Sequence, residues 1–94
     1  MFDVTFDQEG KVHLSGRFDA SQQQVALEAF NTITGSTIID CSKLEYISSA
    51  GIGVLLATQK RLSVGGDYLS MQNLSPHIAE IFRYAGLNAI LKIQ

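Results

Sequence analysis

Residues 37–66 have the sequence TIIDCSKLEYISSAGIGVLLATQKRLSVGG, in which a strand pattern leads into a helix pattern. Residues 37–41 form a short, β-branched, apolar run, which is typical of a strand buried on both faces at the centre of a sheet. An apolar helical segment then opens at residues 48–51 and continues to about Val64, where a Gly-Gly pair ends it. We therefore expect a central strand, a turn and a well-delimited helix in the middle of the chain.

The N-terminal part of the chain predicts a β-hairpin followed by a helix. Phe2, Val4 and Phe6 alternate with polar residues, and a second alternating stretch follows the break at Gly10. An amphipathic helix is then expected over about 20–33, because apolar residues recur there mostly at spacings of three and four. These residues are Val25, Leu27, Ala29, Phe30 and Ile33.

The C-terminal part predicts a strand, a helix and a last strand. Residues 68–71 are a strand candidate, and Ser75-Pro76 combines an N-cap hydroxyl with a proline at the first helical position. The helix is expected over about 76–85, and residues 89–93 supply the last strand. The element order is then β-β-α-β-α-β-α-β, an α/β single domain over residues 1–94 in which about three to four helices pack on a mixed sheet.

Composition excludes several classes of function. With 94 residues, 46% hydrophobic and 17% charged, the chain fits one folded domain. A net charge of -2 with seven Lys and Arg gives no cationic surface for nucleic acid. No apolar run approaches the roughly 20 residues of a membrane-spanning helix, and no signal peptide is apparent, so we expect a cytoplasmic protein without membrane insertion. Cys41 is the only cysteine, which excludes an internal disulfide and favours a buried structural thiol.

The serine pair Ser48-Ser49, placed where the central helix begins, has two interpretations. Either hydroxyl could simply cap the helix by accepting a backbone N–H, which is worth about 1 kcal/mol. The same free N–H groups and the positive end of the helix dipole would also stabilise a phosphoryl group. Gly51 and Gly53 lack side chains and would leave the backbone open to a kinase. The turn therefore suits phosphorylation.

One face of the central helix is predicted to dock a partner. The pattern directs Ile52, Leu55, Leu56, Gln59 and Leu62 toward the core. The outer face is then partly apolar with a basic edge, and a charged group placed beside it would disturb docking. The residues expected on this outer face are Gly53, Val54, Ala57, Lys60, Arg61 and Val64.

Three other patterns predict no chemistry. The run from Gly51 to Leu56 begins like a dinucleotide-binding fingerprint but lacks its third glycine, so a nucleotide-binding domain is a remote alternative. His13 and His77 give no sign of converging with Ser49 or of forming a metal site, and we expect no cofactor. The acidic residues of the hairpin, Asp3, Asp7 and Glu9, are interpreted as a solvated edge.

Taken in order, several segments resemble the anti-sigma factor antagonists of the STAS domain family, and the resemblance covers almost the whole chain. The matching segments are Gly16-Arg17-Phe18-Asp19, Ile38-Ile39-Asp40-Cys41-Ser42, residues 46–56 (YISSAGIGVLL), Gly65-Gly66 and Asn73-Leu74-Ser75-Pro76. The resemblance implies a STAS-like fold and a protein that is not an enzyme.

The resemblance also implies a mechanism. An unmodified antagonist binds an anti-sigma factor that is a serine kinase, phosphorylation breaks that binding, and a serine phosphatase resets it. The acceptor position matches Ser49, and Ser48 replaces an aspartate that often precedes the acceptor. Asp19 matches an acidic position near that site, with helix capping as the alternative role. The expected partner-binding residues are Asp19, Ser48, Ala50, Gly51, Gly53, Val54 and Ala57.

The Ser48 departure leaves a second function open. The chain could be a constitutive STAS docking subunit of a transporter-associated or signalling assembly that is never phosphorylated. The two functions differ in whether Ser49 accepts a phosphoryl group.

Overall fold

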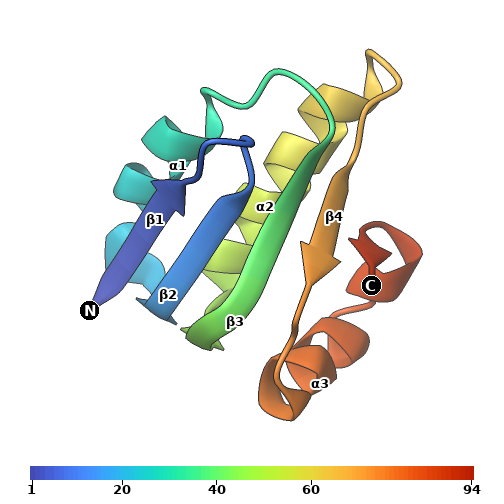
Figure 1. The fold of residues 1–94 in the computed structure, drawn as a ribbon. Coiled ribbons are helices and arrows are strands. Elements are labelled where there is room, and N and C mark those ends of the chain that lie inside the picture. The colour runs from blue at the N-terminus through green and yellow to red at the C-terminus, as the bar shows by residue number, and fades with distance from the viewer.

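The computed structural model describes residues 1–94, which form one mixed sheet with helices packed on it (Figure 1). The strands follow the order β1-β2-β3-β4-β5, with β1 and β2 antiparallel and all other neighbours parallel. This confirms the predicted α/β fold and its element order. The elements are β1 (Phe2–Phe6), β2 (Val12–Phe18), a 3-10 turn (Ala20–Gln22), α1 (Gln23–Phe30), β3 (Thr37–Ile47), α2 (Ser49–Ser63), β4 (Leu69–Gln72), α3 (Pro76–Tyr84), a second 3-10 turn (Leu87–Ala89) and β5 (Lys92–Ile93).

The helices cover the sheet unequally. Helices α1 and α2 lie next to each other on one face, whereas α3 lies beyond the carboxyl end of β4 (Figure 1). Strand β2 shows the result, because Val12 and Leu14 are buried while His13 and Ser15 keep partial exposure on the opposite face. One face of the sheet therefore carries the core, and the other is an open polar face.

The core is a single cluster between the sheet and the helices. Phe30 of α1 is fully buried, and the side chains of Ala26 and Ile33 are buried with it. Val25, which we expected on the buried face of this helix, is 55% exposed. The helix is also shorter than predicted, because its first residues form the 3-10 turn and the regular α-helix ends at Phe30.

Strand β3 differs from the prediction in length and burial. It continues to Ile47, well past the predicted end at residue 41. Pairing with β2 skips one β3 residue between Asp40 and Lys43 and another between Leu44 and Tyr46, so the strand has two bulges. The bulges change the spacing of the inward-facing residues, so the apolar residues of β3 do not alternate strictly. A search for strict alternation therefore misses the second half of the strand. Only one face of β3 is buried, so burial on both faces is wrong. The buried residues are Ile39, Cys41, Leu44 and Ile47.

The last segment also departs from the prediction. Residues 89–93 were expected to form a strand, but β5 has only two residues and a 3-10 turn precedes it. The buried side chains here are Leu87 and Leu91, whose spacing of four is that of a helical turn. Ile90 between them is 54% exposed.

Candidate functional site at the start of α2

Two neighbouring parallel strands end together beside the first turn of α2. Phe18, the last residue of β2, pairs with Ile47, the last residue of β3. The Ser48 N–H continues this ladder by donating to the Phe18 carbonyl oxygen at 2.9 Å. Asp19 and Ser48 are therefore neighbours at the same edge of the sheet, and Ser49 follows directly as the first residue of α2.

The two serines have different roles in this turn. Ser48 is the N-cap of α2, with an extended backbone and a hydroxyl oxygen that accepts the Gly51 N–H at 3.2 Å. The capping interpretation is therefore confirmed for Ser48. The Ser49 side chain is exposed, and its hydroxyl makes no hydrogen bond within the chain. Of the pair, only Ser49 has a hydroxyl that is both exposed and unpaired within the chain.

The backbone around Ser49 favours an anion. The N–H groups of Ser49 and Ala50 precede the first helical hydrogen bond, which the Ile52 N–H donates to the Ser48 carbonyl oxygen. They have no acceptor in the chain, and no acidic side chain lies in the first turn of this 15-residue helix. Unpaired N–H groups and the helix dipole together make this turn locally electropositive.

Asp19 caps the 3-10 turn that precedes α1. Its Oδ1 accepts hydrogen bonds from the Ser21 backbone N–H at 3.1 Å and the Ser21 hydroxyl at 2.5 Å. The hydroxyl hydrogen bond is the main reason why the pKa of Asp19 lies below its ordinary value. The capping role is thus confirmed, and the carboxylate is a fixed negative charge beside Ser48.

Two of the expected partner-contact residues are buried, which corrects their placement. Val54 is 1% exposed and belongs to the core rather than to the outer face of α2. Gly51 is also buried: a Cβ atom there would lie 2.8 Å from Ile47 Cγ1 and 3.0 Å from Phe18 Cγ. Its missing side chain therefore allows α2 to pack closely on the strands and does not open the backbone to a partner.

The exposed stripe of α2 that remains is made of small residues. Ser49, Gly53 and Ala57 follow one another at spacings of four and are all exposed, with Ala50 partly exposed beside them. A Cβ atom at Gly53 would meet nothing within 4 Å, so this part of the surface is unobstructed. We call Ser49, Gly53 and Ala57 the small-residue stripe.

The basic edge that we expected beside the serine lies elsewhere. Lys60 and Arg61 are in the last turn of α2, about 16–18 Å from Ser49 along the helix axis. Arg61 donates hydrogen bonds to the carbonyl oxygens of Phe30 and Ile33, at 2.9 and 2.8 Å. Its guanidinium satisfies the carboxyl end of α1, so it is a structural residue.

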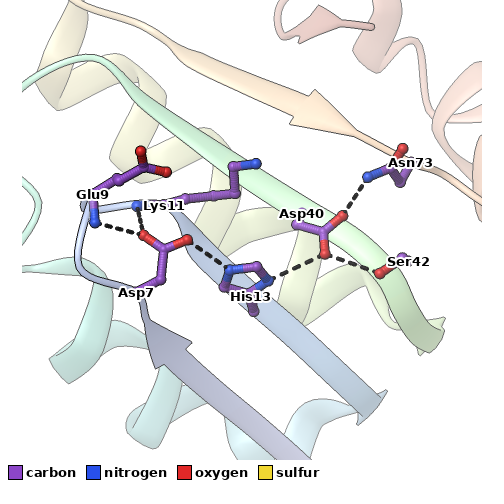
Figure 2. A network of polar contacts seen from close by, with 7 residues as sticks. All are labelled: Asp7, Glu9, Lys11, His13, Asp40, Ser42 and Asn73. Carbon is purple, nitrogen blue, oxygen red and sulfur yellow. Dashed lines mark hydrogen bonds and ion pairs between the residues drawn. The ribbon is translucent and has the colours of Figure 1, made fainter.

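A second polar cluster, which the sequence did not indicate, lies on the open face of the sheet (Figure 2). His13 of β2 lies between two carboxylates: Nε2 is 3.0 Å from Asp7 Oδ2, and Nδ1 is 3.2 Å from Asp40 Oδ2. Asp40 also accepts hydrogen bonds from Asn73 at 2.7 Å and Ser42 at 2.9 Å. The cluster links the hairpin turn, β2, β3 and the residue after β4.

Asp7 is more than the solvated edge charge we expected. Its Oδ1 accepts the backbone N–H groups of Glu9 and Lys11, which fixes the β1–β2 turn, while Oδ2 contacts His13. Only the strand register reveals the rest of the cluster, since His13 pairs with Asp40 in the β2–β3 ladder. A sequence without known pairings gives no signal for that contact.

The cluster shifts the pKa values of its members in opposite directions. The hydrogen bond to Asp7 raises the pKa of His13 above the ordinary 6.5, and the same bond lowers the pKa of Asp7. Burial would raise the pKa of Asp40, but hydrogen bonds from Asn73, Ser42 and His13 outweigh it and lower the pKa below 3.8. The arrangement favours a protonated imidazole between two ionised carboxylates.

Three further observations bear on the class of protein. No group of three or more His, Cys, Asp or Glu side chains has an arrangement that could hold a metal ion. Cys41 is buried, and burial raises the pKa of its thiol to about 12, in agreement with a structural role. None of the helices has the length and apolar character needed to cross a bilayer.

Comparison with known proteins gives a family and several relatives. The family model described as "Mlab, STAS domain" matches residues 3–92. The anti-sigma-B factor antagonist of Bacillus subtilis is 29% identical over 88% of this chain and 79% of its own length. BtrV of Bordetella bronchiseptica, a candidate anti-sigma factor antagonist, is 36% identical over 60% of this chain, and this match spans about half (48%) of BtrV.

Solved structures agree on the fold. The unphosphorylated anti-sigma factor antagonist SpoIIAA aligns with a TM-score of 0.77 and 19% identity, covering 100% of this chain and 88% of SpoIIAA. The phosphorylated form of the Bacillus cell fate determinant SpoIIAA aligns with a TM-score of 0.70 and 18% identity, covering 100% and 91%. Both forms therefore have the fold of this chain.

The two glycines of α2 provide a first test. Gly51→Ala should lower the free energy of unfolding by about 1–3 kcal/mol, because its methyl group overlaps Ile47 and Phe18. Gly53→Ala should raise it by about 0.5–1 kcal/mol, because alanine is the better helix former and has free space there. Urea unfolding of both variants measures the difference, and equal effects would contradict the packing of Gly51.

The His13 cluster predicts a pH dependence of stability. The pKa of His13 is raised in the folded chain, so His13 adds to the free energy of unfolding. This contribution is complete below pH 6.5 and is lost as pH rises through the pKa of the folded state. The lowered pKa values of Asp7 and Asp40 give contributions that are complete above pH 3.8 and are lost as pH falls. The cluster should therefore stabilise the chain most between pH 3.8 and pH 6.5.

The measurement is the urea midpoint at about pH 6 and about pH 8. The wild type should lose stability between the two, and His13→Gln should lose much less. His77→Gln is the matched control, because His77 is exposed and outside the cluster. An unchanged pH dependence in His13→Gln would contradict the assignment.

Proposed function

Because the chain belongs to the STAS domain family, we propose that it is an anti-sigma factor antagonist controlled by phosphorylation of Ser49. It is a cytoplasmic regulatory protein and not an enzyme. Unmodified, it binds an anti-sigma factor that is also a serine kinase; phosphorylated, it is released, and a serine phosphatase resets it. The observation that carries the proposal is the exposed, unbonded Ser49 hydroxyl at the start of α2.

The choice of Ser49 over Ser48 rests on their hydrogen bonds. The Ser48 oxygen already accepts the Gly51 N–H, and modifying it would remove the cap of α2, at a cost of about 1 kcal/mol. Ser49 is at the first helical position, where its modification leaves that cap in place. A kinase that transfers the phosphoryl group to Ser49 therefore acts on a turn that stays folded.

The N-terminus of α2 explains how the modified state remains stable. A phosphoryl group carries a charge of about -1.5 to -2 and strong acceptor oxygens. The Ser49 and Ala50 N–H groups are unpaired, and the helix dipole favours negative charge there. The similarity of this fold to SpoIIAA in both its unphosphorylated and its phosphorylated form supports a switch that leaves the domain intact.

The partner surface in this proposal is the small-residue stripe with its borders. Small side chains at Ser49, Gly53 and Ala57 let a partner approach the backbone of α2 closely, and Ala50 and Asp19 border the stripe at its phosphorylated end. A phosphoryl group on Ser49 would place charge inside that contact and beside the Asp19 carboxylate. The partner would have to desolvate both charges, which accounts for release.

Phosphorylation is tested by intact mass and site mapping after incubation with ATP and a lysate from the protein's own source. The wild type should gain one phosphoryl group on Ser49. Ser49→Ala should gain none, whereas Ser48→Ala should still be modified because its acceptor is intact. If the wild type gains nothing while a control antagonist is phosphorylated in the same lysate, the chain is instead a constitutive STAS docking subunit.

Partner binding is tested by introducing a larger side chain at Gly53. Gly53→Gln should weaken binding to the anti-sigma kinase by about tenfold or more, because its side chain projects into a close contact. Val64→Gln, at the far end of α2 on a residue that is 90% exposed, should bind as the wild type does. Calorimetric titration of the two variants measures this. Equal affinities would place the docking surface elsewhere.

A further inference from the structure

The outer edge of β1 is a second feature that the proposed function does not use. β1 is the first strand of the sheet and pairs only with β2 (Figure 1). At one end of this ladder the Arg17 N–H donates to the Met1 carbonyl oxygen, and at the other the Asp7 N–H donates to the Lys11 carbonyl oxygen, both at 3.0 Å. Hydrogen-bonded pairs alternate along antiparallel strands, so the odd-numbered residues of β1 bond to β2. The N–H and C=O groups of Phe2, Val4 and Phe6 therefore point to the free edge.

The sequence of β1, Phe-Asp-Val-Thr-Phe, is nearly symmetric about Val4. If two β1 strands pair antiparallel with Val4 on the two-fold axis, Val4 exchanges hydrogen bonds with Val4 of the other copy, and Phe2 does so with Phe6. These are the residues whose backbone groups face outward. The symmetry of the sequence and the positions of the outward-facing backbone groups are thus both compatible with a two-fold axis at Val4.

The charges of β1 select the same register. A pairing centred on Asp3 would oppose Asp3 to its own copy, and one centred on Thr5 would oppose Asp3 to Asp7 of the other copy; like charges directly opposite are destabilising. The pairing centred on Val4 opposes Asp3 to Thr5, whose hydroxyl can donate to the carboxylate. It also covers Phe6, which is 45% exposed, with Phe2 of the second copy.

We propose that two copies of this chain associate through their β1 edges, antiparallel and centred on Val4, so that the two sheets become continuous. Strand pairing of this kind is a general property of exposed edges, and the acidic residues here exclude the shifted registers instead of blocking the edge. The contact involves only five residues of each copy, far fewer than the roughly 20–30 a side of a standard interface, so we expect the dimer to be weak and to depend on concentration.

This association does not depend on the phosphorylation switch. The β1 edge and the helix α2 occupy different parts of the molecule, with β2 between β1 and the middle of the sheet (Figure 1). Ser49 remains exposed in each copy, so a dimer carries two docking surfaces. Failure of either proposal leaves the other standing.

Charged substitutions at Thr5 test the proposed register. Self-association of the purified chain is measured by sedimentation equilibrium between about 0.02 and 1 mM, a range suited to weak interfaces. Thr5 is exposed, so its variants should fold. Thr5→Asp places carboxylates opposite Asp3 twice per dimer and should weaken association by about tenfold, whereas Thr5→Lys should strengthen it by about threefold or more. Asp3→Lys combined with Thr5→Asp should restore wild-type association.

Asn88→Asp and Asn88→Lys are the matched controls, because they change net charge equally at an exposed residue near the opposite edge of the sheet. Both should associate as the wild type does. Amide exchange followed by NMR adds a readout by residue: Val4 and Phe6 N–H should become protected as concentration rises, while Asp3 and Thr5 stay unchanged. A wild type that is monomeric at the highest concentration, or Thr5 variants that follow the Asn88 controls, would overturn the proposal.

Discussion

The close packing of Gly51 against Phe18 and Ile47 is the constraint from which the geometry of the site follows. Because a side chain at Gly51 would not fit, the first turn of α2 can approach the ends of β2 and β3 closely. That approach leaves Ser48 as the cap and turns Ser49 to solvent. The same strand ends bring Asp19 beside the turn. One buried glycine thus allows an exposed, unbonded hydroxyl, unpaired N–H groups and a fixed carboxylate to lie together at one edge of the sheet.

Two polar contacts elsewhere in the molecule connect the elements that form this edge. On the helix side, Arg61 joins α2 to the end of α1 through two carbonyl oxygens. On the open side, His13 connects the hairpin turn to β3 through Asp7 and Asp40 (Figure 2). Neither set of contacts includes Ser49, so a phosphoryl group added there would leave both in place.

The sequence was sufficient for the features that depend on local pattern. The element order, the bounds of α2 and a serine cap at its start follow from apolar spacing and capping chemistry, and the structure confirms them. Features that depend on strand register were missed. The bulges of β3 and the contact between His13 and Asp40 require known pairings. The placement of Val54 was wrong because the buried stripe of α2 is rotated from the predicted one. It runs through Gly51, Val54, Leu55, Thr58 and Leu62.

The central claim is that the start of α2 is a partner surface controlled by a phosphoryl group on Ser49. Amide hydrogen exchange tests this claim most directly. It is measured on three samples: the chain alone, the chain bound to the anti-sigma kinase, and the phosphorylated chain mixed with that kinase. The Ser49 and Ala50 N–H groups have no acceptor within the chain and should exchange fast when it is alone. We expect binding to slow their exchange together with that of Gly53, and phosphorylation to abolish the effect of the kinase on Gly53. Protection by the kinase that lies elsewhere, or that persists at Gly53 after Ser49 is phosphorylated, would contradict the account.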